Sequence, residues 1–518
     1  MIFKSPSAAI DIPSSSLPAY ALARAHEFAD RPAYIDAMSG RRVSYDELVD
    51  QVRVIAAGFA EAGMRHGDVI AVCLPNMPEF AVAVFAATSL GGIVTTINPL
   101  YTAEEVGRQL ADAHAKYFLT LGSLLANYRD ALDAAALERV FVIGPGGTTD
   151  TLAWDTLLAS TGAPPAVTID PARDIAVLPY SSGTTGLPKG VMLTHTNLVA
   201  NICMVVEGPN PIEDGEVFAC VPPMFHIYGI VTYLGTAMRR GCTVVCMPRF
   251  DFVEYVKAMA TYRATFAVVV PPVALGLAQH PIVEQYDLSS LRTVVCSAAP
   301  LAPALARTMA ERLGVRVLQG YGMTEVAGAS HVQREDDPPE SVGVALPNVE
   351  WKVIDLETWE SCAIGAEGEI CVRSPSMMMG YLNRPDATAA TIDEDGWLHT
   401  GDIGYADAAG RCYIVDRLKE LIKFKGYQIA PAELEAILLA HHAVADAGVI
   451  PMPDAEAGEV PKAFVVKRAE VSADELMAFV ASHVAPYKKL RAIEFIDALP
   501  KSPAGKLLRR VLRERLGE

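Results

Sequence analysis

Residues 1–330 alternate between two kinds of segment. Short apolar runs rich in β-branched residues, each bounded by glycine or proline, are separated by longer stretches with helical patterns, such as the amphipathic 253–264 (VEYVKAMATYRA). This alternation predicts α/β layers with largely parallel sheets. The expected strands are 69–75 (VIAVCLP), 139–144 (RVFVIG), 175–180 (IAVLPY), 242–248 (CTVVCMP), 266–272 (FAVVVPP), 292–300 (RTVVCSAAP) and 315–322 (VRVLQGYG).

Beyond residue 340 the apolar runs become shorter. The stretch 396–417 (GWLHTGDIGYADAAGRCYIVDR) holds two alternating segments on either side of DAAG, which is typical of a β-hairpin. Together with 351–356 (WKVIDL) and 368–374 (GEICVRS), it predicts a small, mostly β subdomain.

The pattern changes again after Arg417. Helical patterns return, and Ser472 with Glu475 has the spacing of a capping box. This last segment of about 100 residues is of domain size. We therefore expect an α/β fold in which residues 1–417 form a large N-terminal domain of layered α/β subdomains plus the small β subdomain. Residues 418–518 would form a smaller α+β C-terminal domain, with the boundary near Asp416–Lys419.

Composition limits the class of protein. Hydrophobic residues make up 51% and charged residues 20%, which describes a globular chain, and 518 residues exceed one ordinary domain. The formal net charge of −18 argues against nonspecific nucleic-acid binding, which relies on positive patches. A local group of Lys and Arg side chains could still hold an anionic ligand.

The lack of targeting signals and the spacing of the cysteines indicate the cellular compartment. No apolar stretch reaches the roughly 18 residues that a membrane span needs. The first residues (MIFKSPSAAIDIPSSS) lack the apolar segment of a signal peptide, and the last (RERLGE) are not a peroxisomal signal. The nine cysteines are scattered singly, the closest pair being Cys242 and Cys246, and no C-x-x-C occurs. We therefore expect a cytoplasmic protein with reduced thiols, and neither a zinc site nor a disulfide framework.

The loop 181–190 (SSGTTGLPKG) follows one expected strand and precedes an apolar segment. A flexible linker is the ordinary explanation for a Gly/Ser/Thr cluster. In this setting, however, glycines let backbone N–H groups turn inward, hydroxyls add donors and Lys189 supplies charge, which suits a polyphosphate. The P-loop of many NTPases is disfavoured, because Leu187 and Pro188 separate the preceding glycine from Lys189.

Four further stretches have ordinary explanations when each is taken alone: a turn, a strand-end loop, a solvated lysine face and a terminal loop. They are 320–325 (GYGMTE), 400–402 (TGD), 419–428 (KELIKFKGYQ) and 500–506 (PKSPAGK). In order and spacing with 181–190, they resemble the adenylate-forming superfamily of acyl-CoA synthetases, peptide-synthetase adenylation domains and beetle luciferases. The resemblance covers nearly the whole chain. With 224–229 (MFHIYG) included, it is most similar to 4-coumarate–CoA ligases and their bacterial relatives.

The resemblance implies an ATP-dependent ligase. Such an enzyme joins a carboxylate to the α-phosphate of ATP, releases pyrophosphate, and then lets the thiol of CoA displace AMP. Lys506 would stabilise the junction between the acyl carboxylate and the α-phosphate, since positive charge there lowers the barrier to joining two anions. Thr324 would bond the α-phosphate, and Glu325 would reach Mg²⁺, which prefers oxygen ligands. Asp402, an acceptor when ionised, suits the ribose hydroxyls, with Arg417 beside it.

The rest of the nucleotide site follows from the same resemblance. Tyr321 and the turn Ser297-Ala298-Ala299 would sandwich the adenine, and the loop at 181–190 would wrap the β- and γ-phosphates. The residues assigned to ATP or AMP are Ser181, Ser182, Gly183, Thr184, Thr185, Lys189, Ser297, Ala298, Ala299, Gln319, Gly320, Tyr321, Thr324, Asp402, Arg417 and Lys506. The residues assigned a catalytic role are Lys506, His226, Thr324, Glu325 and Lys423.

The resemblance also implies that the C-terminal domain is mobile and rotates between the two half-reactions about a hinge at Lys419. One face would present Lys506 for adenylation, and the other would present the loop that begins at Lys423 for thioester formation. The residues assigned to CoA are Arg249, Lys425 and Gly426, the last of which would leave room for the pantetheine arm.

The acyl pocket would accept a flat or extended acid, because several of its expected lining residues are small. His226 would lie beside the acyl carboxylate and gate the path of the thiol, a satisfied core histidine being the ordinary alternative. No tryptophan stands directly after Glu325, which disfavours acetate. His226 occupies the place where amino-acid-activating domains carry an aspartate, and no carrier domain follows Lys506, so a free amino acid is disfavoured. The residues assigned to the acyl substrate are His226, Ile227, Tyr228, Thr232, Ser297, Ala298, Gly320, Gly322 and Met323.

The identity of the acid stays open. Where the plant ligases have Lys-Ser-Gly-Ala-Ala-Pro this chain has 295–300 (VCSAAP), and Gly328-Ala329-Ser330 replaces a Gly-Pro. Three functions are weighed: an acyl-CoA ligase for 4-coumarate- or cinnamate-type acids, a medium-chain fatty acyl-CoA ligase, and a non-catalytic nucleotide-binding protein. The joint presence of Lys506, Glu325, Thr324, Asp402 and Lys423 argues against the third. Luciferase-type oxygenation, which begins with the same adenylate, also stays open.

Overall fold

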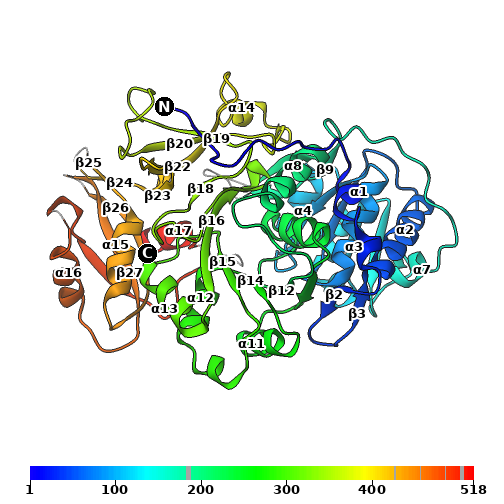
Figure 1. The fold of residues 1–518 in the computed structure, drawn as a ribbon, viewed down its shortest axis with the longest axis horizontal. Coiled ribbons are helices and arrows are strands. Elements are labelled where there is room, and N and C mark those ends of the chain that lie inside the picture. The colour runs from blue at the N-terminus through cyan, green and yellow to red at the C-terminus, as the bar shows by residue number, and fades with distance from the viewer. Residues whose placement is uncertain (182–187, 425–426, 455–456, 485, 502–506, 518) are drawn as a thin grey trace.

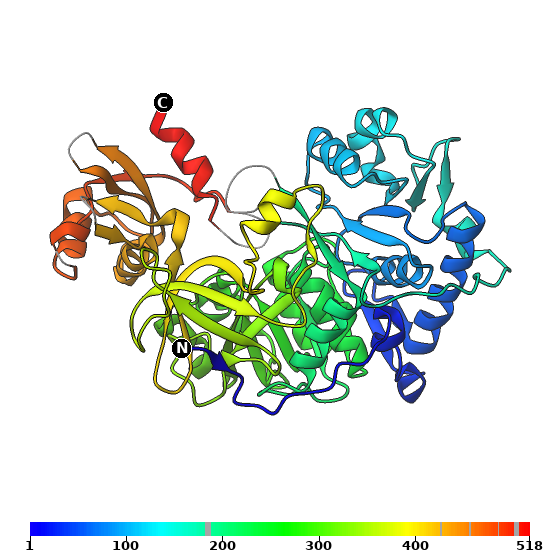
Figure 2. The ribbon, with the colours of Figure 1, turned by 90° about the horizontal axis from the view of Figure 1, so that it is seen from above.

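The computed structural model of the protein describes residues 1–181, 188–424, 427–454, 457–484, 486–501 and 507–517. The strands in this part of the chain form four sheets. Figure 1 shows a larger body at the centre and right, and a smaller one at the left, orange to red, that holds C-terminal residues. Seen from above in Figure 2, the C-terminal elements again stand at the left and the blue N-terminal helices at the right.

The first nine-stranded sheet has the order β10-β11-β9-β5-β4-β6-β7-β8, with β21 paired to β11. From β9 to β8 neighbouring strands are parallel, whereas β11 pairs antiparallel with β9, β10 and β21. The strands are β4 (Val69–Cys73), β5 (Ile93–Thr96), β6 (Tyr117–Leu121), β7 (Arg139–Ile143), β8 (Thr151–Ala153), β9 (Ile175–Val177), β10 (Tyr180–Ser181), β11 (Lys189–Thr194) and β21 (Gly380–Tyr381).

Alternating side chains of this sheet enter two different cores, as the period of two of a β-strand requires. Ile70 and Val72 belong to the core that also holds α2, α3 and α8. Ala71 and Cys73 pack with α4, α5 and α6 on the opposite face. These helices are α2 (Tyr45–Glu61), α3 (Pro78–Ser89), α8 (His195–Val206), α4 (Ala103–Asp112), α5 (Gly122–Leu125) and α6 (Arg129–Ala134).

The second nine-stranded sheet has the order β18-β17-β16-β15-β14-β12-β13-β2-β3 and is parallel from β16 to β2. Helices α11, α12 and α13 cover one face. The other face shares the core of α2, α3 and α8 with the first sheet, so the helices lie between two sheets. Its elements are β2 (Pro32–Asp36), β3 (Arg42–Ser44), β12 (Val217–Cys220), β13 (Thr243–Cys246), β14 (Phe266–Val269), β15 (Thr293–Cys296), β16 (Arg316–Met323), β17 (Gly328–Val332), β18 (Val344–Ala345), α11 (Phe252–Thr261), α12 (Pro271–Gln279) and α13 (Pro303–Leu313).

The third sheet is antiparallel throughout, with the order β1-β19-β20-β22-β23. Its edge strand comes from the N-terminus, where Phe3 stacks on Trp351 with 4.8 Å between the ring centroids. The hairpin expected at 396–417 is confirmed as β22 and β23. The strands are β1 (Phe3–Lys4), β19 (Glu350–Ile354), β20 (Gly368–Arg373), β22 (Leu398–Ala406) and β23 (Cys412–Arg417).

The fourth sheet has the order β25-β24-β27-β26, with β28 beside β27, and encloses its own core with α15 and α16. Ser472 accepts a hydrogen bond from the backbone N–H of Glu475 at 3.2 Å, as the capping pattern predicts. The elements are β24 (Ile422–Phe424), β25 (Tyr427–Ile429), β26 (Val444–Asp454), β27 (Gly458–Lys467), β28 (Ala492–Phe495), α15 (Pro431–Ala440), α16 (Ala473–Ala481) and α17 (Arg509–Glu514).

Charged side chains join this sheet to the rest of the molecule. Asp416, at the end of β23, accepts the backbone N–H of Ala432 in the first turn of α15 at 2.9 Å. Arg513 of α17 lies 2.6 Å from Glu420 in the short helix η6 (Leu418–Glu420). The segment on which the sequence places the domain boundary is therefore held by contacts on both of its sides.

The remaining helical segments are short. No helix in the described ranges has the length and apolar character to cross a membrane. These segments are α1 (Leu17–Ala21), η1 (Ala25–Phe28), η2 (Ala126–Tyr128), α7 (Trp154–Leu158), α9 (Ile227–Gly229), the π-helix η3 (Ile230–Thr236), α10 (Ala237–Arg239), η4 (Pro281–Gln285), η5 (Thr324–Val326), α14 (Pro385–Ala389), η7 (Pro486–Lys488) and η8 (Arg515–Gly517).

The fold class predicted from the sequence is confirmed. Each of the seven expected runs contains a strand, and the interiors of both large sheets are parallel. The amphipathic stretch at 253–264 is α11, which ends at Thr261 because Arg263 takes a positive φ of 50°. The nine cysteines, all in the described ranges, are free.

Candidate active site

The ends of the loop at 181–190 are fixed by strand pairing. Ser181 in β10 and Lys189 in β11 are register partners in an antiparallel pair, so the loop leaves and re-enters the sheet at one point. The ammonium of Lys189 lies 4.8 Å from the ring centroid of Tyr381, a cation–π contact. The predicted residues Ser182, Gly183, Thr184 and Thr185 lie outside the described ranges.

Glu325 lies in η5, directly after β16, and is buried. Its Oε1 accepts hydrogen bonds from the hydroxyls of Ser181 and Tyr381, each at 2.9 Å. Ser181 is the register partner of Lys189, and the ring of Tyr381 lies under the Lys189 ammonium. One carboxylate, two hydroxyls and one ammonium therefore gather at the strand ends that flank residues 182–187. Tyr381 was missed by the sequence analysis, because the pair Gly380-Tyr381 has no local pattern. It reaches the site because β21 pairs with β11.

Asp402 is buried and both of its carboxylate oxygens are occupied by partners. Oδ2 accepts the hydroxyl of Tyr321 at 2.6 Å, and Oδ1 lies 2.8 Å from Nε of Arg417. Burial, and then the charge of Asp402, raises the pKa of Tyr321, so its hydroxyl stays protonated and donates. The structure thus brings together three residues that the sequence analysis assigned to the nucleotide.

The turn after β15 is the one that the sequence analysis assigned to the adenine. Ala298 takes a positive φ of 74° and is exposed. The side chain of Gln319 braces this turn, since its Oε1 accepts the N–H of Leu301 at 3.0 Å while its Nε2 donates to Pro339 at 2.6 Å. Behind Tyr321 lies His331, with ring centroids 5.9 Å apart, and burial lowers the pKa of His331 to about 3, so that ring is neutral. Ala299, the third residue of the turn, is half-buried.

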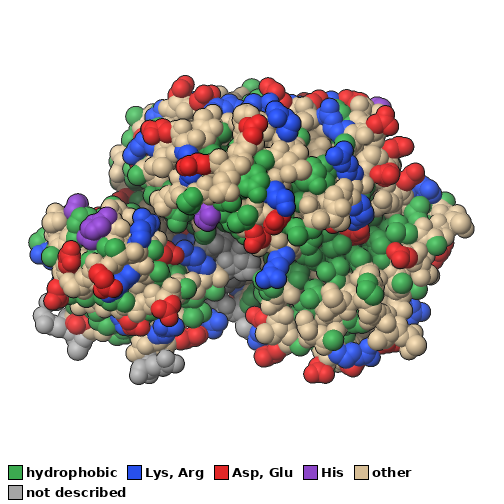
Figure 3. Space-filling model, turned by 90° about the horizontal axis from the view of Figure 1, so that it is seen from below, with side chains coloured by type: hydrophobic (Ala, Val, Ile, Leu, Met, Phe, Trp, Pro, Cys, Tyr) green, Lys and Arg blue, Asp and Glu red, His purple; other side chains and the backbone are tan. Residues whose placement is uncertain are grey.

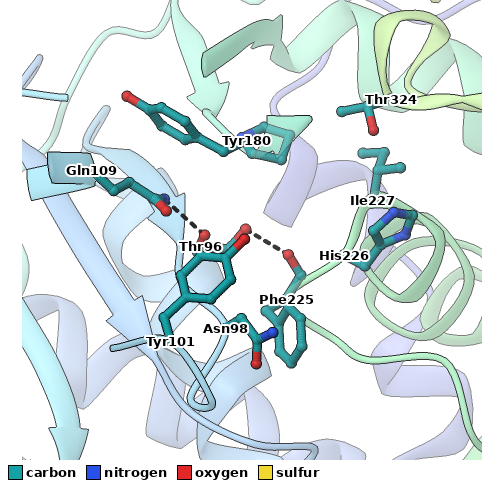
Figure 4. Close-up of a pocket in the computed structure, with 10 residues that line it drawn as sticks. Thr96, Asn98, Tyr101, Gln109, Tyr180, Phe225, His226, Ile227 and Thr324 are labelled. Atoms are coloured by element: carbon teal, nitrogen blue, oxygen red, sulfur yellow. Dashed lines mark hydrogen bonds between the residues drawn. The ribbon is translucent and has the colours of Figure 1, made fainter. Parts of the chain in front are cut away.

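His226 and Thr324 line one pocket (Figure 4). His226 begins α9, and its Nδ1 accepts the N–H of Tyr228 at 3.3 Å. Figure 4 shows Thr324 and Tyr180 on one side of the pocket, with His226 and Ile227 on another. Its volume of about 70 Å³ is below the roughly 300–1,000 Å³ of a complete ligand pocket. The cavity by itself is too small for a whole nucleotide.

Two side chains that the sequence analysis missed hold the segment before His226. Asn76 donates to the carbonyl of Pro222 at 3.2 Å and accepts the N–H of Met224 at 2.7 Å. Thr96 donates to the carbonyl of Phe225 at 2.6 Å, a bond drawn in Figure 4. Thr96 is the last residue of β5, and Asn76 follows the end of β4 by three residues. Their role depends on a contact between sheets, which no local sequence pattern records.

The expected acyl side contains a buried polar atom. The hydroxyl oxygen of Tyr228 is buried, and no hydrogen bond of ordinary geometry reaches it from the described residues, although Ser297 lies near it. Burial raises its pKa, and the neighbouring Ser297 opposes that effect. Gly320 lies close to the same serine, since a Cβ built on it would stand 2.9 Å from the Ser297 hydroxyl oxygen.

Gly322 and Met323, also assigned to the acyl substrate, lie in β16, and Thr232 lies in η3. A Cβ on Gly322 would stand 1.9 Å from the carbonyl oxygen of Gly328, so the β16–β17 turn requires glycine there. Thr232 is a half-buried residue of η3, and Met323 packs against the core of the third sheet.

The residues assigned to CoA and to the hinge are not brought to this pocket by any described contact. Lys423 is exposed in β24, and its backbone N–H donates to Glu459 at 2.8 Å. Arg249 is exposed after β13. Lys419 lies in η6. Lys425, Gly426 and Lys506 lie outside the described ranges, so their roles stay predictions.

Figure 3, a view from below, shows Lys and Arg side chains, with Asp and Glu side chains among them, along the facing edges of the two bodies. It also shows a concave hydrophobic surface on the larger body. Basic side chains around a concave surface attract anionic ligands in spite of a negative net charge.

Comparison with known proteins places the chain in a family. A family model described as AMP-binding enzyme matches residues 22–382, and one described as AMP-binding enzyme C-terminal domain matches residues 433–506. The chain therefore belongs to the AMP-binding enzyme family, which confirms the resemblance to adenylate-forming enzymes. A 4-coumarate–CoA ligase of Pinus taeda is 43% identical over 510 residues, covering 96% of this chain and 95% of that protein.

Solved structures agree with this assignment. ATP-bound MatB from Rhodopseudomonas palustris superposes with a TM-score of 0.87 at 29% identity, covering 96% of this chain and 98% of that one. The anthranilate CoA ligase AuaEII in complex with anthranoyl-AMP superposes with a TM-score of 0.89 at 25% identity, covering 98% of each chain.

Proposed function

We propose that the protein is an ATP-dependent acid–CoA ligase that activates an aryl-propenoic acid of the 4-coumarate or cinnamate type. The observation that carries the proposal is the similarity to 4-coumarate–CoA ligases, which reaches 43% identity and extends over nearly the whole chain. The reaction would use three small molecules, the carboxylic acid, ATP and CoA. We place it in the cytoplasm, where ATP and CoA are both abundant.

The chemistry has two steps. An oxygen of the acid attacks the α-phosphorus of ATP, and the bond from that phosphorus to the bridging oxygen of pyrophosphate breaks. The sulfur of CoA, having lost its proton, then attacks the acyl carbon, and AMP leaves with the oxygen that came from the acid. The first step brings two anions together, so groups that hold charge at the junction lower its barrier.

The residues of this chain have separate tasks in that scheme. Asp402, aimed by Tyr321 and Arg417, accepts hydrogen bonds from the ribose hydroxyls. Lys189 and Ser181 hold the outer phosphates, and the adenine lies between Tyr321 and the turn that follows β15. Thr324 contacts the α-phosphate, and Lys506 bridges that phosphate and the acyl carboxylate. His226 shapes the end of the acyl site that the thiol must reach.

Glu325 is the residue we propose for Mg²⁺. A buried carboxylate beside two hydroxyls offers the hard oxygen donors that this ion prefers, so the donor set fits. When bound, Mg²⁺ would neutralise charge on the phosphates. Tyr381 holds the carboxylate in place through Oε1.

A rotation of residues 418–518 about Lys419 is the further part of the proposal. Lys506 would serve adenylation in one orientation. The loop that begins at Lys423, together with Arg249, would serve CoA in the other. The largely covered ion pair between Arg509 of α17 and Glu435 of α15, at 2.6 Å, lies wholly inside this part of the chain and supports its movement as one unit.

The acid is identified by a panel of substrates. The protein is incubated with ATP, Mg²⁺ and CoA against 4-coumarate, cinnamate, benzoate and octanoate, and thioester and AMP are measured by mass spectrometry. Strong thioester formation with 4-coumarate or cinnamate and weak formation with octanoate is expected. The reverse preference would favour a medium-chain fatty acyl-CoA ligase. No AMP with any acid would support a nucleotide-binding protein without catalysis.

A matched pair of lysine variants tests the role of Lys506. Lys506→Ala should lower adenylation by about 10²–10³-fold while thioester formation from premade acyl-AMP is largely kept. Lys501→Ala, in the same segment, is the control, since Lys501 pairs with Asp446 at 2.5 Å within the C-terminal part. Equal losses in both half-reactions of the Lys506 variant would contradict the proposed role.

A further inference from the structure

Glu369 in β20 holds the backbone just before Asp402. Its side chain is buried, with the residue 5% exposed, and its two oxygens have different partners. Oε1 accepts the backbone N–H of Gly401 at 2.9 Å. Oε2 lies 2.9 Å from Nδ1 of His399. One carboxylate therefore ties together two residues of the segment 399–402.

This segment is a bulge in the third sheet. Cys371 pairs with His399 and Glu369 pairs with Ile403, so three residues of β22, 400–402, lie opposite Ile370 alone. Gly401 takes a φ of 67°, a conformation that favours glycine. A bulge of this kind removes backbone groups from the ladder, and buried N–H groups need other partners. The carboxylate of Glu369 is the partner of Gly401.

The neighbouring threonine fixes the other side of the bulge. The Thr400 hydroxyl donates to the carbonyl of Ile370 at 2.7 Å and accepts the N–H of Asp402 at 3.1 Å. With Glu369 on one side and Thr400 on the other, the backbone that carries Asp402 has two side-chain attachments to β20. The direction of the Asp402 carboxylate thus depends on both.

His399 connects this attachment to two further groups. Its Nε2 lies 3.5 Å from Asp393 and its Nδ1 lies 3.6 Å from the sulfur of Cys371. The imidazole is mostly covered, with 17% of the side chain exposed. An exposed ion pair contributes little to stability. The His399–Glu369 pair differs, because its carboxylate is buried and also accepts the N–H of Gly401.

We propose that Glu369 and His399 are positioning residues for the nucleotide, because they hold the bulge that aims Asp402 at the ribose. The inference rests on the proposed function, in which Asp402 binds the ribose hydroxyls. Neither residue touches the nucleotide in this account. Both act through the backbone of 399–402.

Affinity for different phosphate compounds separates positioning from a general structural role. ATP and AMP carry ribose hydroxyls, whereas tripolyphosphate has none. Glu369→Ala should weaken the binding of ATP and AMP by about tenfold to a hundredfold, the effect of misplacing one group by about 1 Å. Tripolyphosphate should bind to this variant as it binds to the wild-type protein.

The same experiment includes a rescue and a control. Glu369→Gln keeps an oxygen for Gly401 and should lose less than about fivefold in ATP affinity, because an uncharged hydrogen bond contributes about 1 kcal/mol. Glu367→Gln changes an exposed carboxylate two residues away and should change nothing. Glu369→Ala and the wild-type protein should have equal affinity for 2′,3′-dideoxy-ATP, because this nucleotide lacks the ribose hydroxyls from which Asp402 accepts hydrogen bonds.

Calorimetry on the full chain measures these affinities without any acid or CoA. Two results for Glu369→Ala would overturn the proposal while the proposed function stands. One is an equal loss of affinity for ATP and for tripolyphosphate, and the other is an affinity for ATP as high as that of the wild-type protein. Failure of the wild-type protein to bind ATP would overturn both.

A metal site is the competing explanation of this cluster. The ligand atoms of Glu369, Cys371 and His399 lie within 4.8 Å of one another. Thiolate, imidazole and carboxylate together suit Zn²⁺ or Co²⁺. We expect Co²⁺ added to the full-length protein to give no thiolate–cobalt absorption. Such an absorption, abolished in Cys371→Ser, would make the cluster a metal site and overturn the proposal.

Discussion

Tyr321 donates its hydroxyl hydrogen to Oδ2 of Asp402 across 2.6 Å, although the two residues are 81 positions apart and lie in different sheets. Arg417 holds the other oxygen at 2.8 Å. A carboxylate fixed in this way needs little rearrangement when it meets a ligand, which is the general advantage of a preorganised site. We therefore place the proposed nucleotide site where the second and third sheets meet.

Asp402 is the first residue to change. Asp402→Asn keeps the size of the side chain and an acceptor for Tyr321 but removes the charge, so the KM for ATP should rise about tenfold to a hundredfold, as expected for losing charge-assisted hydrogen bonds. Asp395→Asn, an exposed carboxylate in the turn before β22, is the control. Steady-state kinetics with ATP varied gives the answer. An unchanged KM for ATP would remove Asp402 from the site.

Tyr381 links the phosphate loop to Glu325. Tyr381→Phe removes the hydrogen bond to Glu325 but keeps the ring under Lys189, so the Mg²⁺ concentration for half-maximal rate should rise about tenfold. Tyr381→Leu also removes the cation–π contact, and the KM for ATP should rise a further two- to fivefold or so. Tyr413→Phe, whose hydroxyl bonds Asp407, is the control. Equal Mg²⁺ dependence in the wild-type protein and Tyr381→Phe would contradict this role.

The hydroxyl of Tyr228 is buried beside Ser297, and among the described residues no hydrogen bond of ordinary geometry reaches it. A buried donor of this kind favours a ligand that brings a polar group to it. In Tyr228→Phe the ratio of kcat/KM for 4-coumarate to that for cinnamate should fall about fivefold to tenfold. The thermal midpoint should stay or rise, since an unpaired polar atom is removed. A ratio that does not change would mean that this hydroxyl does not face the aromatic ring of the acid.

The strands of the two large sheets could be predicted from the sequence because buried parallel strands are short continuous apolar runs with glycine or proline at their ends. The pairing of strands with one another could not be predicted in this way. Phe3 pairs with Trp351, and β21 pairs with β11, through contacts between distant segments that leave no trace in local composition.

In the candidate site, too, local motifs could be recognised in the sequence, whereas contacts between distant segments could not. Glu325 and Asp402 belong to motifs and were predicted, whereas Tyr381, Asn76 and Glu369 were missed. Each of these three acts by bonding to a residue or backbone group far along the chain. Local spacing identifies residues that meet a ligand in many proteins. It does not identify residues that hold other residues in place.

The dependence of stability on pH tests the charge state of His399. Interaction with the sulfur of Cys371 and then with the carboxylate of Glu369 raises the pKa of His399 to about 10, and Asp393 faces its other nitrogen. A raised pKa stabilises the folded protein fully below the unfolded value of about 6.5, and that stability is lost as pH rises through about 10. The urea midpoint of the wild-type protein should therefore exceed that of His399→Gln most at pH 6, with a shrinking difference toward pH 10.

The control for that measurement is His442→Gln, an exposed histidine of the C-terminal part. Its urea midpoint should follow that of the wild-type protein at every pH. A difference between the wild-type protein and His399→Gln that grows with pH would mean that the ring is neutral in the folded state.

In the proposed first step, a carboxylate oxygen of the acid attacks the α-phosphorus of ATP. An acid labelled with ¹⁸O in its carboxylate, turned over with ATP, Mg²⁺ and CoA, tests it most directly by mass spectrometry of the products. One ¹⁸O should appear in each AMP and none in pyrophosphate, because the acid oxygen stays on phosphorus when the thiol displaces AMP. Label in pyrophosphate or inorganic phosphate, or unlabelled AMP formed together with thioester, would contradict the account.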